Sequence, residues 1–186
     1  MKLKYKIIII ISCVFIFLYF FIILWYNGLI WPNTPSKKKY PVRGVDVSSY
    51  QGEIDWETLE NQDIDFAFIK ATEGSGYEDE YFQQNFQNAS ETGIRIGAYH
   101  FFSFDSSGIT QAENFIKTVP KTQNMLPPVI DLEFYAQHGS DPPEKEETRY
   151  NLQKMIDAVY DYYGLMPVIY VTDITYELYI KGYFDD

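Results

Sequence analysis

The sequence contains few of the residues that form disulfides and transition-metal sites. Its 186 residues include one cysteine, Cys13, and two histidines, His100 and His138. A single cysteine excludes a disulfide within the chain. So few thiol and imidazole groups also argue against a zinc site built from histidine and cysteine. We therefore expect no cofactor and no metal, and a hydrolase built on this chain would have to work with carboxylates.

Basic side chains are scarce outside the N-terminal segment. Six of the 15 Lys and Arg residues lie within the first 42 positions, where there is no Asp or Glu. The rest of the chain therefore carries nine basic and 26 acidic side chains. A domain with this balance would be repelled by phosphate backbones, so we expect no nucleic-acid partner.

One long apolar run occupies residues 7–26 and follows the basic segment 1–6. At about 1.5 Å per residue, the run spans about 30 Å of hydrocarbon. A cleavable signal peptide would have a shorter run that ends in small residues, and no A-x-A-like site is present. We predict a transmembrane signal anchor at 7–26, a cytoplasmic segment at 1–6, a linker at 27–42 and an extracytoplasmic domain at 43–186. Lipidation of Cys13 is the weaker alternative.

From residue 42 onward, short apolar segments alternate with helix-like ones. Strands are predicted at 42–47, 65–71, 95–102, 128–134 and 167–172. Helices are predicted at 55–62, 80–92, 110–119, 145–163 and 173–181. Regular alternation favours a parallel sheet with crossover helices. Five such units are too few for a closed eight-stranded barrel of about 250 residues, so an open doubly wound sheet remains an alternative.

Nucleotide binding has little support in this pattern. No glycine-rich G-x-G-x-x-G or G-x-x-x-x-G-K-[ST] motif follows any predicted strand. Those glycines are needed because backbone amides must approach a phosphate closely. A catalytic or binding site on this chain therefore has to be built from residues other than a glycine-rich phosphate-binding loop.

Polar side chains gather where the predicted strands end. In parallel sheets these ends converge on one rim, where active sites of such folds lie. The polar residues concerned are Asp46, Lys70, Glu73, Tyr99, His100, Asp131, Glu133, Tyr170 and Thr172, and the apolar Phe101 lies among them.

The pair Asp131 and Glu133 is the most specific signal among them. Side chains at positions i and i+2 of a strand point to the same face, with their backbones about 6.5–7 Å apart. Glycoside hydrolysis needs one protonated carboxyl to protonate the leaving oxygen and one carboxylate to stabilise positive charge at the anomeric carbon. Like charge and partial burial raise the pKa of one member of such a pair. The spacing leaves the choice between retention and inversion open.

Several segments together resemble glycoside hydrolase family 25, the Chalaropsis-type lysozymes. They follow the family's order and approximate spacing, and the resemblance covers about residues 43–183. The segments are 44–48 (GVDVS), 50–52 (YQG), 54–56 (IDW), 68–74 (FIKATEG), 97–102 (GAYHFF) and 126–133 (LPPVIDLE).

The resemblance implies an α/β fold, an incomplete TIM-like (β/α) barrel with five strand–helix units followed by three further strands. It implies cleavage of the β-1,4 bond between N-acetylmuramic acid and N-acetylglucosamine. By position, Glu133 matches the general acid, and Asp131 matches the carboxylate that assists, either through the substrate's 2-acetamido group or more directly. Asp46 matches a further acidic residue of the site, or a group that fixes the rim.

The resemblance also implies residues that bind the sugar. Tyr99, Tyr170 and Phe101 are expected to line the glycan groove, and ordinary aromatic packing is the alternative for each tyrosine. For His100 we favour a structural hydrogen bond at the strand end. Lys70 and Glu73 could pair with each other or with a carboxylate of the site, and we assign neither a catalytic role.

The sequence departs from the family after the fifth unit. It ends at Asp186, whereas the family's three further strands supply a wall of the barrel. A truncated reading frame, a partner chain that completes the barrel, and a degenerate protein are the three explanations.

These observations lead to one functional hypothesis and two alternatives. We expect a single-pass protein of the bacterial cell membrane whose domain acts on peptidoglycan glycan strands as a lysozyme. The alternatives are a non-catalytic, membrane-anchored peptidoglycan-binding remnant and a structural subunit completed by another chain. The biological setting stays open.

Overall fold

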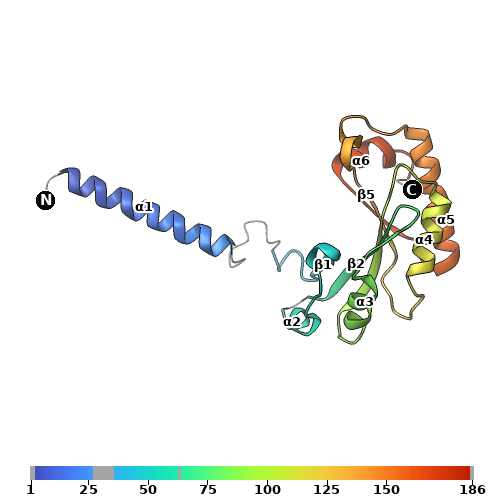
Figure 1. Cartoon of the computed structure of the whole chain (residues 1–186), viewed down its shortest axis with the longest axis horizontal. Coiled ribbons are helices and arrows are strands. Elements are labelled where there is room, and N and C mark those ends of the chain that lie inside the picture. The colour runs from blue at the N-terminus through green and yellow to red at the C-terminus, as the bar shows by residue number, and fades with distance from the viewer. Residues whose placement is uncertain (1–2, 27–35, 63, 185–186) are drawn as a thin grey trace. The chain divides into compact units, whose positions relative to one another are not determined.

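The computed structural model describes residues 3–26, 36–62 and 64–184. The chain divides into two compact units, Met1–Pro41 and Val42–Asp186. The first unit holds the long helix α1, Leu3–Tyr26, and the second is an α/β domain (Figure 1). Within the predicted linker, residues 27–35 lie outside the described residues.

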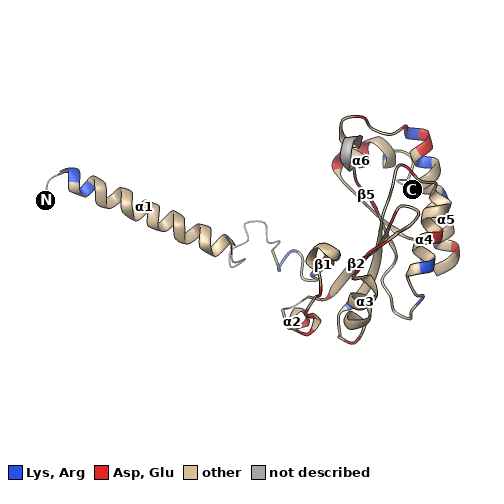
Figure 2. Cartoon of the chain, in the orientation of Figure 1, with Lys and Arg blue, Asp and Glu red and all other residues tan. Residues whose placement is uncertain are grey.

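Helix α1 is apolar around its whole circumference, and none of its 24 residues is buried. At about 1.5 Å per residue it is about 36 Å long, which exceeds the hydrocarbon thickness of a bilayer. Lysines mark its first turns, and acidic side chains are spread over the second unit (Figure 2). The helix is long and apolar enough to cross a membrane, and a signal sequence would share these properties.

The second unit is built on a curled parallel sheet. Its parallel strands are β1 (Gly44–Val47), β2 (Phe66–Glu73), β4 (Arg95–Phe101), β5 (Val129–Leu132) and β6 (Val168–Val171). Their order in the sheet is their order in the chain. A doubly wound sheet would reverse its strand order at a switch point, so the described strands rule out that alternative.

The two faces of the sheet differ in character, as strand β2 shows. Ala67, Ile69 and Ala71 are buried, whereas Phe66 and Phe68 are half-buried. Because side chains alternate along a strand, the first three lie on one face and the two phenylalanines on the other. The first face packs against the helices, and the second lines a hollow.

The helices bury the outer face of the sheet. They are α2 (Trp56–Glu60), α3 (Phe82–Ser90), α4 (Gly108–Thr118), α5 (Lys145–Tyr163) and the short α6 (Asp173–Thr175), followed by a π-helical turn at Tyr176–Ile180. Helices α4 and α5 pack closely at Gly108. A Cβ atom there would lie 1.7 Å from the carbonyl oxygen of Asn151, so only glycine fits. The amide of Gly108 donates a hydrogen bond to Oδ1 of Asn151 at 3.0 Å.

The predicted strands and long helices are confirmed to within a few residues, and α5 has the predicted bounds. The pattern missed the small strand β3 (Tyr77–Glu78), which pairs antiparallel with the end of β2. It also missed two short 3₁₀ helices, Ser49–Gln51 and Ala136–Gly139. The β2–β3 hairpin and the first of these helices lie at the rim where the candidate site is found.

Candidate active site

The concave face of the sheet encloses a hollow of about 440 Å³. Five of the six predicted site residues line it together. The lining residues are Gly44, Val45, Asp46, Phe66, Phe68, Tyr99, Val129, Asp131, Glu133, Val168, Ile169 and Tyr170.

Glycines and phenylalanines shape the floor of the hollow. A Cβ atom at Gly44 would lie 2.2 Å from the ring of Phe66, and one at Gly97 would lie 2.5 Å from the ring of Phe68. Both rings therefore lie over the backbone of a neighbouring strand, where any larger residue than glycine would displace them. This packing gives the hollow an apolar floor beneath its carboxylates.

The register of the sheet brings the polar side chains together. Asp131 of β5 is paired with Tyr170 of β6 on one side and with Phe101 of β4 on the other. Tyr99 lies two residues before Phe101, and therefore on the same face of β4. The side chain of Asp46 reaches the hollow from β1. Glu133, the first residue after β5, reaches it from the end of that strand.

Asp131 is the most perturbed carboxyl group of the site. Burial raises its pKa to about 7, with further increases from the charges of Glu133 and Asp46, against a decrease from Lys70. Its Oδ1 atom is the one buried side-chain oxygen or nitrogen of the described residues that lacks a hydrogen-bond partner. A carboxyl group in this environment holds a proton near neutral pH, because nothing nearby solvates its negative charge fully.

The two tyrosines of the hollow lie in the field of these carboxylates. The pKa of Tyr170 is raised, first by the charge of Glu133 and then by burial, Asp131 and Asp46. The pKa of Tyr99 is raised by burial and by the charges of Asp46 and Asp131, while a hydrogen bond with Ser48 opposes the increase. Both hydroxyl groups therefore stay protonated and can donate hydrogen bonds to a ligand.

Phe101 is not among the residues that line the hollow. It lies two residues further along β4 than Tyr99, at the rim, and its ring centroid lies 4.9 Å from Nζ of Lys70 and 5.8 Å from the ring of Tyr135. Of the two pairings considered for Lys70 and Glu73, the structure has the ion pair between them, with 2.7 Å between Nζ and Oε2. Phe101 is thus a rim residue supported by a cation and an aromatic ring.

His100 has the structural role predicted for it. It is fully buried on the outer face of β4. Its Nε2 atom lies 3.0 Å from Oε1 of Gln111, and its Nδ1 atom lies 2.7 Å from Oγ1 of Thr72. The amide nitrogen of Gln111 donates to the carbonyl oxygens of Ser103 and Ser106, so Oε1 must accept from His100. The neutral ring therefore carries its proton on Nε2 and accepts from Thr72 on Nδ1.

Sequence reasoning missed Asp79, which fixes the loop after β1. Asp79 is 2% exposed, and its carboxylate accepts hydrogen bonds from the amides of Ser49 at 2.9 Å and Tyr81 at 3.1 Å. Ser48, the residue before Ser49, is hydrogen bonded to Tyr99. Asp79 thus holds the turn that supports one of the tyrosines. No periodicity in the sequence marks such a residue, because its partner Ser49 lies 30 positions away.

Tyr135 was also missed, although it stands two residues after Glu133. Its hydroxyl group lies 3.0 Å from Oγ of Ser103, accepts from the amide of Phe104 at 3.2 Å, and donates to Oδ2 of Asp105 at 3.0 Å. The loop after β5 is thereby tied to the loop after β4. These contacts restrict the backbone that carries Glu133.

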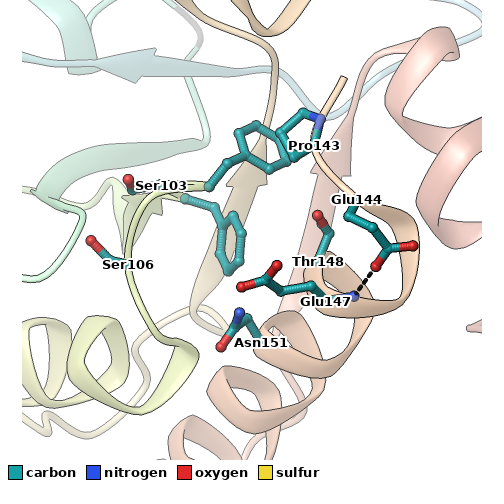
Figure 3. A pocket seen from close by; sticks show the side chains of 9 residues that line it. Ser103, Ser106, Pro143, Glu144, Glu147, Thr148 and Asn151 are labelled. Atoms are coloured by element: carbon teal, nitrogen blue, oxygen red, sulfur yellow. Dashed lines mark hydrogen bonds between the residues drawn. The ribbon is translucent and has the colours of Figure 1, made fainter. Parts of the chain in front are cut away.

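A second, smaller pocket lies between the loop after β4 and the start of α5 (Figure 3). There, Oε2 of Glu144 accepts a hydrogen bond from the amide of Glu147 at 2.8 Å and caps the helix. The pocket measures about 20 Å³, which is room for a water molecule but not for a sugar ring. Its lining residues are Phe102, Ser103, Phe104, Ser106, Pro143, Glu144, Glu147, Thr148 and Asn151.

The hollow on the concave face is therefore the candidate active site. Within the described part of the chain, no group of three or more His, Cys, Asp or Glu side chains is placed to hold a metal ion. The hollow offers paired carboxylates, one of them holding a proton near neutral pH, together with tyrosine hydroxyls above an apolar floor. Such an arrangement can transfer a proton to a bound sugar and stabilise positive charge on it.

Comparison with curated proteins places these features in a known group. The chain is 35% identical over 152 residues to the uncharacterized protein YegX of Escherichia coli (strain K12), covering 79% of this chain and 54% of YegX. It is 43% identical over 96 residues to Lysozyme M1 of Streptomyces globisporus, covering 50% of this chain and 33% of that protein. The chain spans about half the length, or less, of these relatives.

Solved structures give the same result. A family 25 glycosyl hydrolase from Bacillus anthracis matches with a TM-score of 0.76 and 53% identity, covering 77% of this chain and 66% of that one. A bacterial lysozyme from Streptomyces coelicolor matches with a TM-score of 0.68 and 33% identity, covering 73% of this chain and 65% of that one. The sequence profile of the family described as "Glycosyl hydrolases family 25" matches residues 45–184, so the chain belongs to that family.

Proposed function

We propose that this chain is a lysozyme-type hydrolase of peptidoglycan. In this proposal it cleaves the β-1,4 bond between N-acetylmuramic acid and N-acetylglucosamine. The observation that carries the proposal is the meeting of Asp131 and Glu133 in one hollow of a family 25 domain. The relatives named lysozyme support the substrate class.

The pair can supply both functions that glycoside hydrolysis needs. Because the two carboxyl groups interact, their protons belong to the pair rather than to either residue. We assign to Glu133 the proton transfer to the leaving oxygen, since it stands at the open end of β5. Asp131 lies deeper, and we assign to it the stabilisation of the anomeric centre, either through the 2-acetamido group of the substrate or more directly. The raised pKa of Asp131 supports a pair that retains one proton near neutral pH.

Other lining residues fit binding roles in this proposal. Asp46 is an exposed carboxylate on the opposite side of the hollow and can accept hydrogen bonds from sugar hydroxyls. Tyr99 and Tyr170 offer hydroxyl donors and apolar ring surface, which suits pyranose rings. Phe101, at the rim, would contact a sugar unit further along the glycan strand.

We further propose that the domain is an incomplete TIM-like barrel of five strand–helix units, spanning residues 43–186. Strand β6 ends the sheet, and among the described strands it pairs only with β5. Val168 and Tyr170 on this strand are 50% and 57% exposed. An edge of this kind is open to pairing with another strand, so we propose that a partner chain can complete the wall of the hollow there.

For the N-terminal part, we propose that residues 7–26 anchor the protein in the bacterial cell membrane as a single pass. Residues 1–6 would face the cytoplasm, and residues 27–42 would link the anchor to the extracytoplasmic domain. The apolar helix α1 supports this arrangement, as does a substrate that lies outside the membrane.

The proposal is tested with the full-length protein in detergent, mixed with purified peptidoglycan. Release of new reducing ends by the wild type and its loss in Glu133→Gln are expected. Glu113→Gln, which changes an exposed residue of α4 in the same way, should retain the activity. A disaccharide with an aryl leaving group needs little protonation at cleavage, so it should recover much of its turnover in Glu133→Gln but not in Asp131→Asn.

The same samples distinguish the alternative function. If wild type sediments with peptidoglycan but releases no reducing ends, the chain is a non-catalytic peptidoglycan-binding protein. The exposed edge of β6 favours this second function when no partner is present, because one side of the hollow is then unenclosed. Aryl-substrate rescue in Asp131→Asn instead of Glu133→Gln would exchange the roles of the two carboxyl groups.

A further inference from the structure

Lys70 brings a positive charge to a site dominated by carboxylates. It follows Phe66 and Phe68 at alternate positions of β2, and so shares their concave face. It is paired in register with Tyr99 of β4. Its side chain is only 12% exposed, although lysine side chains are seldom buried without a partner.

Three neighbours hold the Lys70 ammonium in one place. Glu73 accepts its hydrogen bond at 2.7 Å between Nζ and Oε2. The ring of Phe101 lies 4.9 Å from Nζ and the ring of Tyr77 lies 5.6 Å away, both within the range of cation–π attraction. An exposed surface ion pair would be mobile and weakly coupled to its surroundings. The Lys70 ammonium is instead enclosed between two rings and a carboxylate.

The enclosed charge acts on Asp131 from the rim of the hollow. Phe101, which contacts the ammonium, is the residue of β4 that pairs with Asp131 of β5. The charge of Lys70 lowers the pKa of Asp131, against the increases from burial, Glu133 and Asp46. The groups whose charges act on Asp131 are Asp46 of β1, Lys70 of β2 and Glu133 after the end of β5. The tyrosines Tyr99 of β4 and Tyr170 of β6 lie in the field of the same carboxylates, which raises the pKa of both hydroxyl groups, so they stay neutral where Asp131 titrates.

We propose that Lys70 is a positioning residue whose ammonium, fixed by Glu73, Tyr77 and Phe101, keeps the Asp131–Glu133 pair at one proton rather than two. The same contact holds the Phe101 ring at the rim. The inference rests on the proposed hydrolase function for its catalytic meaning. The effect of the Lys70 charge on the titration of Asp131 can be measured whether or not the protein turns over a substrate.

The direct test is a ¹³C NMR titration of the full-length protein in detergent, with the side-chain carboxyl carbon of aspartate labelled. The Asp131 signal is assigned by its disappearance in Asp131→Asn. In Lys70→Met the midpoint of the Asp131 titration should move to higher pH, because removal of a cation disfavours the carboxylate. Lys70→Arg keeps the charge and should leave the midpoint near that of the wild type.

A matched control accounts for the change in net charge. Lys117→Met removes an exposed lysine of α4, away from the hollow, and should leave the Asp131 midpoint unchanged. Lys70→Gln is a second variant without the charge, and unlike Lys70→Met it keeps a hydrogen-bond donor for Glu73. An Asp131 midpoint that is the same in wild type and in folded Lys70→Met and Lys70→Gln would overturn the inference.

Activity provides a second readout that a merely structural residue would not affect in the same way. In Lys70→Met both limbs of the pH profile of kcat/KM should move to higher pH, so that the ratio of kcat/KM at pH 8 to that at pH 5 rises at least about threefold. An equal loss at every pH would indicate a structural role and contradict the proposal. If the wild type has no activity but the NMR shift is found, the proposed hydrolase function fails and the assignment of Lys70 stands.

Discussion

The Nε2 atom of His100 donates a hydrogen bond to Oε1 of Gln111, and this contact joins the middle of the sheet to helix α4. Oε1 of Gln111 also accepts from the amide of Ser103 at 2.7 Å. The imidazole therefore anchors the loop after β4, next to the rim where Phe101 lies. A buried neutral histidine in this role makes the fold sensitive to acid.

The first prediction concerns this sensitivity. Burial lowers the pKa of His100 to about 4, with a smaller decrease from the charge of Lys70 and an opposing effect of the hydrogen bond to Gln111. The unfolded chain binds the proton near pH 6.5, so the contribution of His100 to stability is complete above pH 6.5 and is lost as the pH falls towards 4. The full loss is about 3 kcal/mol.

Asp131 acts in the opposite direction over nearly the same range, so the measurement should be made in Asp131→Asn. The free energy of unfolding of this variant, followed by near-ultraviolet circular dichroism in urea, should fall between pH 7 and pH 4. Adding His100→Gln should remove most of this pH dependence while lowering stability at pH 7. A pH dependence that persists in the double variant would assign it to another group.

The second prediction is that the candidate catalytic carboxyl destabilises the fold at high pH. Because the pKa of Asp131 is raised to about 7, its ionised form is penalised in the folded state. The penalty is absent below about pH 4 and complete above pH 7. Asp131→Asn should therefore raise the free energy of unfolding at pH 8 by about 1–2 kcal/mol, after allowance for its partial exposure to solvent.

The same variant should show no gain at pH 4, where the aspartate is protonated in both states. Urea unfolding of wild type and Asp131→Asn at the two pH values tests this, and Asp161→Asn on the exposed surface of α5 is the matched control. Lower stability of Asp131→Asn at pH 8 would show that the carboxylate is better solvated than its unpaired Oδ1 atom indicates.

The third prediction concerns the hydroxyl group of Tyr135. Tyr135→Phe removes three hydrogen-bond partners at once, those of Ser103, Phe104 and Asp105. The free energy of unfolding should fall by about 1–2 kcal/mol, because the amide of Phe104 is left without its acceptor. The loop that follows Glu133 would also lose its anchor, so kcat on peptidoglycan should fall more than KM rises.

Tyr160→Phe is the control for this change, since Tyr160 is an exposed residue of α5. It should alter neither stability nor turnover. Equal kcat values for wild type and Tyr135→Phe, despite reduced stability, would restrict Tyr135 to a structural role.

Much of the fold follows from local patterns in the sequence. Alternating residues such as Phe66 to Ala71 predict a strand with two different faces, and the apolar periodicity of residues 145–163 predicts α5 with its observed bounds. The grouping of Asp46, Asp131 and Glu133 also follows, because residues at the same ends of parallel strands must meet. These predictions need only the periods of strands and helices.

What the sequence does not reveal depends on distant partners. Asp79 binds an amide 30 positions earlier, and Tyr135 binds groups about 30 positions earlier. Phe101 shares a strand face with Tyr99, yet it lies outside the lining of the hollow, and the alternation of side chains along a strand does not show where on a face a hollow ends. These contacts, and the extent of the hollow, depend on the curvature of the folded sheet.

The residues of the hollow come from both outer strands of the described sheet, with Asp46 on β1 and Tyr170 on β6. Three other strands separate Asp46 from Tyr170, so the width of the hollow depends on how strongly the five parallel strands curve. A flatter sheet would move Asp46 away from Asp131 while leaving Asp131 and Glu133, neighbours on one strand, at their present spacing. Mechanical strain along the sheet would therefore act on contacts that span the hollow and on the charge of Asp46 that raises the pKa of Asp131, while the spacing of the two carboxyl groups would be the last property to change.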